Sequence, residues 1–376
     1  MRIEGPWTDS APATFICDRL LGCGHRALFV GGAVRNTVLG IPVGDLDVAT
    51  DARPEKVLAV FDRTDAKLCV QGIQFGTIMI VREGTSIAVT SFRRDIETDG
   101  RYARVAFTDR IEEDAARRDF TMNAIYAEFD GMLIDPLGGL DDLLKRRVRF
   151  VGNPRGMLRL FRFHAHFGDP AAGIDPDGLE AVTEFADGIE IISAERTTIE
   201  LLNILRAPLP GRSVSSMAET GLLERILPGA SPDVLLRIEH LERIFEVGPD
   251  PLRRLAAIGG NTDLMTLDRR SAARLRRLLS GIDLHLSAEE LGYRFGEQEG
   301  LDVAILCAAR ADAVPPADLR ERIREGSAQE FPVRAWHLPD YLEGQAIGST
   351  LRMLERCWIA SGFNMTVNEL ISSLDT

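Results

Sequence analysis

Residues 28–50, which read LFVGGAVRNTVLGIPVGDLDVAT, constrain the fold of this chain more than any other segment. An apolar run ends in Gly31 and Gly32, a short helical pattern follows, and a second apolar run carries Asp45 and Asp47. The segment predicts a strand, a tight turn, a short helix and a second strand. Glycine at the turn lets the backbone approach a bound group closely, which a side chain would prevent.

Asp45 and Asp47 are separated by one residue in the second predicted strand, and alternate strand residues point to the same face of a sheet. Two adjacent carboxylates repel each other unless a cation lies between them. Oxygen ligands of this kind suit Mg²⁺, which binds one or two carboxylates and completes its shell with substrate phosphates. We therefore predict a Mg²⁺ site here, with the glycine turn and Arg35 holding a phosphate. Taken alone, the pair could also be two solvent-facing acids after a turn.

The period of the hydrophobic pattern changes along the chain. Residues 1–142 alternate short β-rich runs with helical segments, which predicts an α+β head with a mixed sheet of the five-stranded type. From about Leu143 the period becomes 3.6 residues and remains so, which predicts helices only. We expect a head at 1–142, a helical neck at 143–215, and a helical body and tail at 216–376.

Charge and composition exclude some functions. The net charge of −13 argues against a surface coated with positive charge for non-specific nucleic-acid binding. Arginine-rich tracks remain at 145–150, 155–164 and 268–279, although the third could equally be a solvated helix face. No apolar run approaches the roughly 20 residues of a membrane helix. The five cysteines form no CxxC pair, so we expect a cytoplasmic protein with reduced thiols and no membrane partner.

The segment RRDFTMN, at residues 117–123, joins two cations to an acid and an amide at the end of a helical pattern. A nucleoside triphosphate needs this mixture, with cations for the phosphates and Asp or Asn for a ribose hydroxyl. The candidate nucleotide-binding residues here are Arg117, Arg118, Asp119 and Asn123. A purely structural cluster of ion pairs would use the same residue types.

The order of these motifs resembles that of the nucleotidyltransferase superfamily that includes DNA polymerase β. The details are similar to its class II branch, which comprises bacterial CCA-adding tRNA nucleotidyltransferases and related poly(A) polymerases. Besides residues 28–50, the resemblance rests on SFRRDIETDGRYARVAF at 91–107, which matches a flexible loop, EEDAARRDFTMNAIY at 112–126, DPLGGLDDL at 135–143 and ERTTIELLNIL at 195–205.

The resemblance implies a template-independent enzyme that adds C and A from CTP and ATP to the 3′ end of tRNA. The terminal 3′-OH would attack the α-phosphate, Mg²⁺ would be held by Asp45 and Asp47, and the helical tail would bind the tRNA. Arg159 and Arg162, which survive from the neck motif, join the nucleotide-binding residues. The loop at 91–107 favours addition of CCA or A over addition of CC only. A poly(A) polymerase of the same branch and an RNA-binding relative impaired in catalysis remain alternatives, and the oligomeric state is open.

Two positions in the head depart from the family pattern. Asn36 stands where many members carry Asp. Ala88, in IAVTSFRRD, stands where the family usually has an acid. If that acid is the third metal ligand, Asp45 and Asp47 must hold the metal alone.

The neck motif also departs from the family, which carries EDxLRxLRxxRF. The chain reads VGNPRGMLRLFRF at 151–163, so Asn153 and Gly156 occupy the positions that select the incoming base, and several residues are missing. The shortening is either a true deletion or a loop that the sequence as read does not include. The intact pattern on both sides favours a missing loop. A spacing of about 3.8 Å between consecutive Cα atoms at 154–157 would exclude it.

Overall fold

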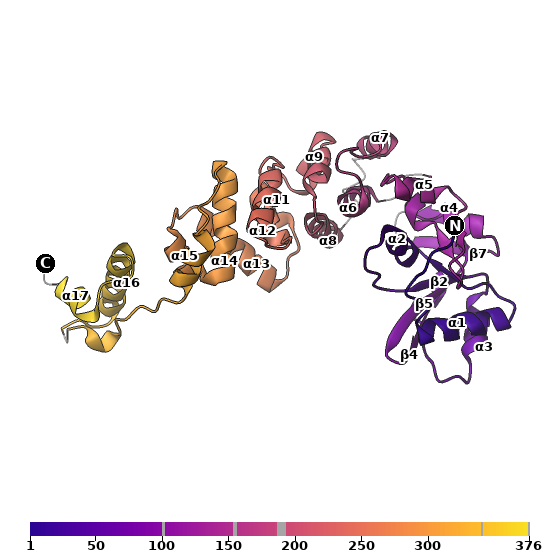
Figure 1. Ribbon diagram of the computed structural model, residues 1–376, viewed down its shortest axis with the longest axis horizontal. Helices are drawn as coiled ribbons and strands as arrows, with labels where there is room; N and C mark the ends of the chain where they lie inside the picture. The colour runs from indigo at the N-terminus through magenta and orange to yellow at the C-terminus, as the bar shows by residue number, and fades with distance from the viewer. Residues whose placement is uncertain (100–101, 153–155, 186–192, 340, 375–376) are drawn as a thin grey trace. The chain divides into compact units, whose positions relative to one another are not determined.

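The computed structural model describes residues 1–99, 102–152, 156–185, 193–339 and 341–374 (Figure 1). They form two compact units: unit 1 comprises Met1–Ile192 and Arg212–Leu222, and unit 2 comprises Ser193–Gly211 and Leu223–Thr376. The α+β class is confirmed, with the sheet in the N-terminal part and helices after it. The three-part division into 1–142, 143–215 and 216–376 stays a prediction.

Unit 1 contains a mixed sheet with the strand order β3-β4-β5-β2-β1-β8-β9. Its strands are β1 (Leu28–Val30), β2 (Asp47–Thr50), β3 (Lys67–Cys69), β4 (Thr77–Arg82), β5 (Thr85–Ser91), β8 (Tyr126–Ala127) and β9 (Leu133–Ile134). β2 and β5 run parallel, and the other neighbours run antiparallel. The sheet is seven-stranded rather than five-stranded. β8 and β9 have two residues each, too few for a period-2 pattern to reveal.

Helices of unit 1 cover this sheet and continue beyond it. They are α1 (Ala11–Gly22), α2 (Gly32–Leu39), α3 (Pro54–Phe61), η1 (Ile73–Phe75), α4 (Ile111–Ala116), η2 (Thr121–Asn123), α5 (Gly139–Leu144), α6 (Met157–Phe167), α7 (Pro176–Phe185) and most of α9 (Gly211–Glu219). α1 and α3 lie together against β5 and β4 (Figure 1). The core beneath α4 includes Val30, Ala49, Phe92 and Tyr126, all buried.

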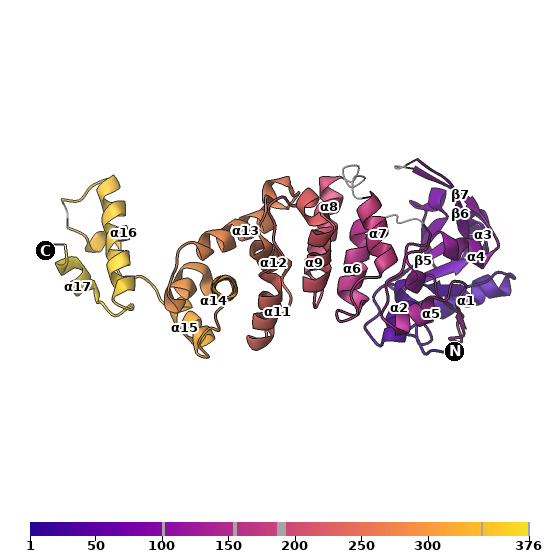
Figure 2. The same cartoon turned by 90° about the horizontal axis from the view of Figure 1, so that it is seen from above.

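The segment that resembles a flexible loop, residues 91–107, folds as a two-stranded antiparallel ribbon (Figure 2). Its strands are β6 (Arg93–Asp99) and β7 (Tyr102–Phe107), with a bulge between Asp95 and Glu97. Residues 100 and 101 lie outside the described residues. β6 contacts α4, so the base of the ribbon is tied to the helix that precedes the RRDFTMN motif.

Unit 2 is helical, as the change of period predicted. Its elements are α8 (Ala194–Leu205), α10 (Leu222–Ile226), α11 (Leu235–Ile244), α12 (Pro251–Ile258), η4 (Thr262–Leu264), α13 (Arg269–Ile282), α14 (Ala288–Ala311), α15 (Leu319–Ser327), η5 (Ala335–His337), α16 (Gln345–Ala360) and α17 (Val367–Ser372). α14 is kinked at Gly296, whose φ is 76°. Within the described ranges, no helix is long and apolar enough to cross a membrane.

A buried network of charges joins the helices of unit 2. Arg253 and Arg254 are each about 1% exposed. Arg253 pairs with Glu242 at 2.6 Å and with Asp302 at 2.7 Å. Arg254 pairs with Glu242 at 2.5 Å and donates a hydrogen bond to the Leu205 carbonyl, at the end of α8, at 2.7 Å. Glu242 therefore neutralises two buried guanidinium groups that bind three different helices together.

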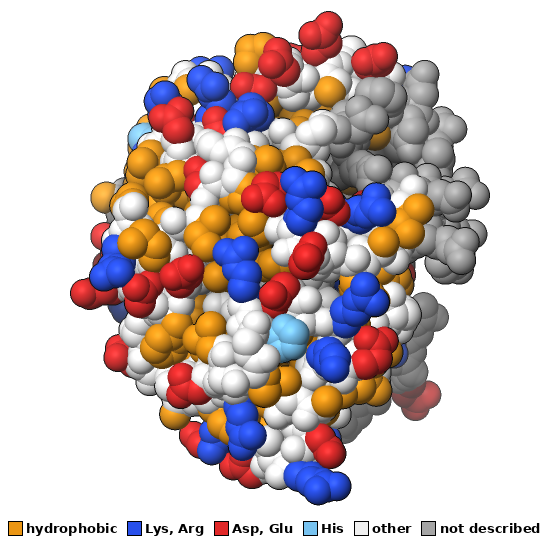
Figure 3. Space-filling view, turned by 90° about the vertical axis from the view of Figure 1, so that its right-hand side faces the viewer, with side chains coloured by type: hydrophobic (Ala, Val, Ile, Leu, Met, Phe, Trp, Pro, Cys, Tyr) orange, Lys and Arg blue, Asp and Glu red, His pale blue; other side chains and the backbone are white. Residues whose placement is uncertain are grey.

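Charges on the surface are mixed rather than segregated. On the face shown in Figure 3, basic and acidic side chains are intermingled with apolar ones. The arginine track at 268–279 follows the same rule, because Arg274 pairs with Asp250 at 2.8 Å and Arg277 with Glu299 at 2.7 Å. Acids therefore balance part of this track, and its two interpretations stay open.

We predict that Glu242→Ala destabilises the protein by about 3–5 kcal/mol, because it leaves two buried arginines without their shared partner. Glu321→Ala is the matched control, since it breaks the exposed ion pair with Arg324 and should cost less than about 1 kcal/mol. Urea unfolding followed by circular dichroism measures both. Equal losses of stability in the two variants would contradict the role given to the buried network.

Candidate active site

The predicted phosphate turn lies at the end of β1. Gly31 has φ 70° and ψ −127°, a backbone conformation that glycine adopts readily, and α2 begins at the next residue. The Gly31 carbonyl accepts the Arg35 amide at 3.0 Å, so the turn leads directly into the helix. A Cβ on Gly31 would lie 3.8 Å from Nη1 of Arg118. The glycine turn and the RRDFTMN motif therefore meet.

Asp45 and Asp47 lie at the start of β2. Because β1 and β2 are antiparallel, this is the same edge of the sheet as the turn that ends β1. β2 begins at Asp47, so Asp45 belongs to the preceding loop and the predicted strand is shorter than expected. Both residues are exposed on one side. Protein atoms crowd the Asp47 carboxyl from the other side and raise its pKa; Asp45 raises it further, while Arg118 opposes the rise. The two carboxylates thus act on each other electrostatically, a repulsion that a bound cation would relieve.

The sheet register places Ala88 beside Asp47. The two residues are partners on the parallel strands β5 and β2, and such partners point to the same face. An acid at 88 would therefore join the aspartate pair, but Ala88 has only a methyl group. Among the described residues, no group of three or more His, Cys, Asp and Glu could hold a metal. Two carboxylates still fit an ion such as Mg²⁺ that takes further ligands from substrate phosphates.

Asp114, on α4, accepts hydrogen bonds from both arginines of the RRDFTMN motif. Arg117 donates to Asp114 Oδ1 through Nε at 2.9 Å and Nη2 at 2.7 Å. Arg118 Nη2 donates to Oδ2 at 3.0 Å, and the Tyr126 hydroxyl donates to the same oxygen at 2.7 Å. Burial alone would raise the pKa of Asp114, but the charges of Arg118 and Arg117 and the Tyr126 hydrogen bond lower it below its ordinary value.

Neither Asp114 nor Tyr126 was a predicted site residue. The available signal was helical spacing, since an acid three and four residues before two arginines faces both of them. The structural interpretation of this motif, a cluster of ion pairs, therefore holds for the side of the arginines that faces Asp114. Arg118 Nη1 donates to the Asn123 carbonyl at 3.4 Å and also lies beside the glycine turn, so the same residue has structural contacts and a place next to the site.

A second network joins four of the predicted nucleotide-binding residues. Arg35 Nη1 donates to Asn123 Oδ1 at 2.8 Å, and Asn123 Nδ2 donates to Asp119 Oδ1 at 2.9 Å. Arg159, on α6, donates through Nε to Asp119 Oδ2 at 3.0 Å. Residues from α2, from the segment 119–123 and from α6 are therefore brought together, although the sequence separates them by up to about 120 positions.

Arg35 lies against an aromatic surface. Its guanidinium is 4.0 Å from the ring centre of Phe167 and 5.3 Å from that of Phe163. Arg162, the other arginine of the neck motif, also lies over Phe163, at 4.6 Å. Burial lowers the pKa of Arg35 to about 10. The negative charge of Asp119 acts to raise this pKa, and the positive charge of Arg162 lowers it further. The arginine stays charged at neutral pH, but it is poorly hydrated, which strengthens its interaction with a bound anion.

Asn36, which replaces the family's Asp, positions Arg35. Its Oδ1 accepts from Arg35 Nε at 3.1 Å and Nη2 at 2.8 Å, and its Nδ2 donates to the Pro42 carbonyl at 2.8 Å. The amide thus keeps the acceptor that an acid would supply, without its charge. Arg35 is left with more uncompensated positive charge than an Asp at this position would allow.

The DPLGG turn packs against the RRDFTMN motif. Both carboxylate oxygens of Asp135 accept backbone amides at the start of α5, from Gly139 at 2.8 Å and Leu140 at 2.9 Å. A Cβ on Gly139 would lie 2.1 Å from the Thr121 carbonyl, so only glycine allows this approach. Thr121 in turn donates to buried Asp142 at 2.7 Å. The turn therefore fixes the segment that carries Asn123.

Of the two base-selecting positions of the neck, only Gly156 lies among the described residues, and it has no side chain. Gly156 precedes α6 with φ 112°, and a Cβ there would lie 3.0 Å from Arg159 Cδ. A side chain at 156 is therefore strained in this fold. Asn153 and the spacing test at 154–157 fall on residues 153–155, which lie outside the described residues. The full sequence is continuous from 1 to 376, so the expectation of a missing loop is wrong and the shortening belongs to the chain.

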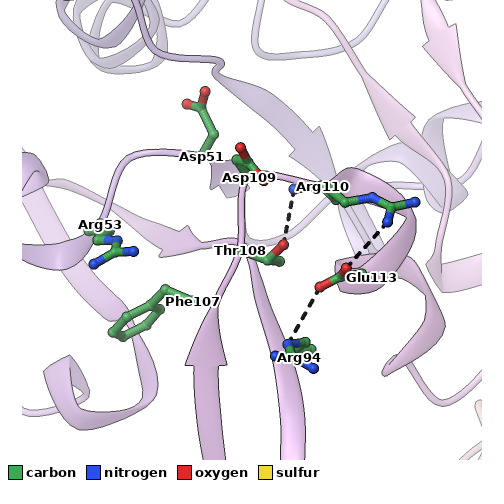
Figure 4. A pocket seen from close by; sticks show the side chains of 8 residues that line it. All are labelled: Asp51, Arg53, Arg94, Phe107, Thr108, Asp109, Arg110 and Glu113. Carbon is green, nitrogen blue, oxygen red and sulfur yellow. Dashed lines mark hydrogen bonds and ion pairs between the residues drawn. The ribbon is translucent and has the colours of Figure 1, made fainter.

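A polar cavity of about 570 Å³ lies at the opposite end of β2 from Asp47 (Figure 4). It is lined by Asp51, Arg53, Arg94, Phe107, Thr108, Asp109, Arg110 and Glu113. Glu113 forms ion pairs with Arg94 at 3.7 Å and Arg110 at 3.6 Å across its wall (Figure 4). These charges largely satisfy one another, and the predicted site residues do not line the cavity.

Comparison with known proteins places this site in a family. A model of the "Poly A polymerase head domain" matches residues 27–149, and one of the "Probable RNA and SrmB- binding site of polymerase A" matches residues 173–234. The CCA tRNA nucleotidyltransferase 1, mitochondrial, of Danio rerio is 31% identical over 369 residues, covering 92% of this chain and 86% of the relative. The chain belongs to the class II family of CCA-adding tRNA nucleotidyltransferases and poly(A) polymerases. The resemblance drawn from the motifs is confirmed.

Other relatives match over a shorter length. The CCA-adding enzyme of Geobacillus thermodenitrificans is 40% identical over 216 residues, which are 55% of this chain and 52% of the relative. The chain thus spans about half the length of the Geobacillus relatives it matches. Members of this family generally use a divalent metal ion.

Solved structures share the fold over nearly the whole chain. The Bacillus stearothermophilus CCA-adding enzyme in complex with CTP has a TM-score of 0.69 at 26% identity, covering 96% of this chain and 94% of the other. The Thermotoga maritima CCA-adding enzyme complexed with tRNA has a TM-score of 0.68 at 17% identity and full coverage of both chains, a similarity of fold.

We predict that Asp114→Asn lowers the free energy of unfolding at neutral pH by about 3–5 kcal/mol, because it removes the charge that two arginines share. The folded pKa of Asp114 lies below the ordinary 3.8. The stabilisation by its charge is therefore fully present above that value and is lost as the pH falls through the folded pKa. Urea unfolding from neutral pH to about pH 2 should show the difference between variant and wild type shrinking in acid.

The control for this pH dependence is Asp141→Asn, whose carboxylate forms an exposed pair with Lys145 at 2.8 Å. Its stability should follow that of the wild type at every pH to within about 1 kcal/mol. If the difference in the free energy of unfolding between Asp114→Asn and wild type stays constant as the pH falls, the charge of Asp114 is not the source of the stability.

Proposed function

We propose that this chain is a tRNA nucleotidyltransferase that adds C and A from CTP and ATP to the 3′ end of tRNA. The observation that carries this proposal is the meeting of the Gly31 turn, the Asp45–Asp47 pair and Arg118 at one edge of the sheet. Membership of the family and a fold shared with CCA-adding enzymes support it. A poly(A) polymerase is less favoured, because the relatives that match over most of the chain are named for CCA addition.

Asp45 and Asp47 are the residues that would hold Mg²⁺. When bound there, the ion would favour deprotonation of the tRNA 3′-OH and neutralise charge on the phosphates. The backbone at Gly31 and Gly32 and the guanidinium of Arg118 would bind the triphosphate. Because Asp114 already fixes the arginine, little freedom is lost when the nucleotide binds.

The Arg35–Asn123–Asp119–Arg159 network would bind the nucleoside. Asp119 and Asn123 offer an acceptor and an amide to a ribose hydroxyl, and Arg35 lies between them and the glycine turn. Gly156 offers no side chain to the base. We propose that Arg159 and Arg162, one helical turn apart on α6, provide the donors that face it.

The helices of unit 2 would bind the tRNA by its shape and backbone. The paired arginines of α13 limit how much of that surface is basic. The cytoplasmic location expected from the cysteines belongs to the same proposal.

The direct test is an incorporation assay with tRNA that lacks its CCA end, each NTP in turn, and Mg²⁺. We expect CTP and then ATP to be incorporated, with a product of defined length. Asp45→Ala and Asp47→Ala should each lower the rate by at least about a thousandfold while leaving tRNA affinity nearly unchanged. Asp109→Ala is the matched control, an exposed acid at the other end of β2, and should retain the wild-type rate.

Other outcomes would reject parts of the proposal. Incorporation that survives in either aspartate variant would reject the metal assignment. A long tail of A residues would identify a poly(A) polymerase instead. Binding of tRNA without incorporation at high Mg²⁺ and NTP concentrations would identify a non-catalytic relative, the outcome that Ala88 makes worth testing.

We predict that Ala88→Glu strengthens metal binding, because position 88 lies beside Asp47 in the β2–β5 register. The Mg²⁺ concentration for half-maximal incorporation should fall by about tenfold, and calorimetric titration with Mg²⁺ alone should show the same direction. Ser86→Glu is the control, since it adds the same charge on the same face of β5 but beyond the paired part of β2. Equal effects of the two substitutions would mean that only the added charge matters.

A further inference from the structure

Arg93 is the first residue of β6, and one residue separates it from the end of β5. Its backbone amide donates to Asp114 Oδ1 at 3.3 Å, which places it next to the arginine pair of the second motif. Arg93 was not among the predicted site residues, and nothing in the proposed function uses it.

Part of the Arg93 guanidinium is buried without a hydrogen-bond partner among the described residues. Its Nε and Nη1 atoms are inaccessible to solvent and have no hydrogen-bond partner among the described residues. Burial lowers the pKa of Arg93 to about 10; the charge of Arg117 adds to this, while Asp114 opposes it. A buried donor that carries charge and lacks an acceptor is costly, and such groups usually have a partner that the bare protein does not show.

The neighbouring acid cannot serve as that partner. Both oxygens of Asp114 already accept hydrogen bonds, from Arg117 and Arg118 and from the Tyr126 hydroxyl. Arg93, Arg117 and Arg118 therefore lie around Asp114. The charge of Asp95, on β6, also acts on Arg93, so two carboxylates oppose three guanidinium groups and a net positive charge remains. Like charges brought together in this way create a site for an anion.

This positive cluster continues the proposed phosphate site. Arg118 acts electrostatically on both Asp47 and Arg93, and its Nη1 reaches the Gly31 turn. One side of the cluster thus faces the aspartate pair, and the other ends at the unpaired donors of Arg93. We propose that Arg93 binds a phosphate group of a bound substrate, using the two donors that Asp114 leaves unpaired.

This inference rests on the proposed function for the identity of the substrate, and two sources could supply the phosphate. One is the terminal phosphate of the incoming nucleotide, and the other is a backbone phosphate near the 3′ end of the tRNA. Both present the same oxygens to a guanidinium. Binding measurements without turnover separate the sources and do not depend on catalysis.

The test compares Arg93→Gln with Arg94→Gln in the full-length protein. Arg94 is the adjacent residue, points to the other side of β6, and forms an exposed pair with Glu113 at 3.7 Å, so it is the matched control. Calorimetry measures binding of ATP, ADP and AMP with Mg²⁺ but without RNA. A separate titration measures binding of tRNA lacking its CCA end.

If the nucleotide supplies the phosphate, Arg93→Gln weakens ATP binding by about tenfold or more and leaves AMP binding unchanged. If the tRNA supplies it, tRNA binding weakens by a similar factor and ATP binding is unchanged. Arg93→Lys, which keeps the charge but not the fork of donors, should fall between Arg93→Gln and wild type. Arg94→Gln should match wild type in every titration.

Thermal unfolding separates a binding role from a structural one. Because Arg93 Nε and Nη1 have no described partner, Arg93→Gln should leave the Tm of the ligand-free protein unchanged or raise it. A lower Tm, or affinities for ATP and tRNA that both equal those of Arg94→Gln, would overturn the inference. Absence of ATP and tRNA binding in the wild type would instead overturn the proposed function, and the inference with it.

Discussion

The carboxylate of Asp114 is the interaction on which the arrangement of the active site depends. It is about 1% exposed and holds Arg117, Arg118 and the Tyr126 hydroxyl at once. A single buried negative charge can keep two arginines in place only if they approach it from different sides. That geometry directs Arg118 toward the Gly31 turn, where a phosphate is expected. The positive charge of the site is thus pre-oriented by one acid that need not touch the substrate itself.

A carboxylate that accepts from more than one side chain joins elements in both units. Asp119 joins the head to α6 through Asn123 and Arg159, and Glu242 joins the helices of unit 2 through Arg253 and Arg254. The chain departs from its family at the points where such acceptors would be added: Ala88 has no carboxylate and Asn36 has no charge. The site therefore carries more uncompensated positive charge beside the Asp45–Asp47 pair than it would with acids at positions 36 and 88.

Much of the fold could be predicted because the hydrophobic period is a local property. The short helical pattern after Gly31 corresponds to α2, and the change near Leu143 marks the start of the helical part. The prediction was less successful where packing decides the conformation. Asp45 lies in a loop, because β2 pairs with its neighbours only from Asp47 onward. Strands β8 and β9 exist through pairing with β1 and with each other, which two-residue segments cannot reveal.

The sequence by itself determined the order of the motifs, the residue types of the site and the family, since these depend on which side chains are present and at what spacing. It also located the departures at Ala88 and Gly156. Only the tertiary structure decided which cations are neutralised. Arg117 and Arg93 are the same residue type. Yet Arg117 donates hydrogen bonds to Asp114, whereas Arg93 has buried donors without a described partner. Neutralisation depends on distances between atoms from β6, α4 and β8, which are set by the folded sheet and not by spacing along the chain.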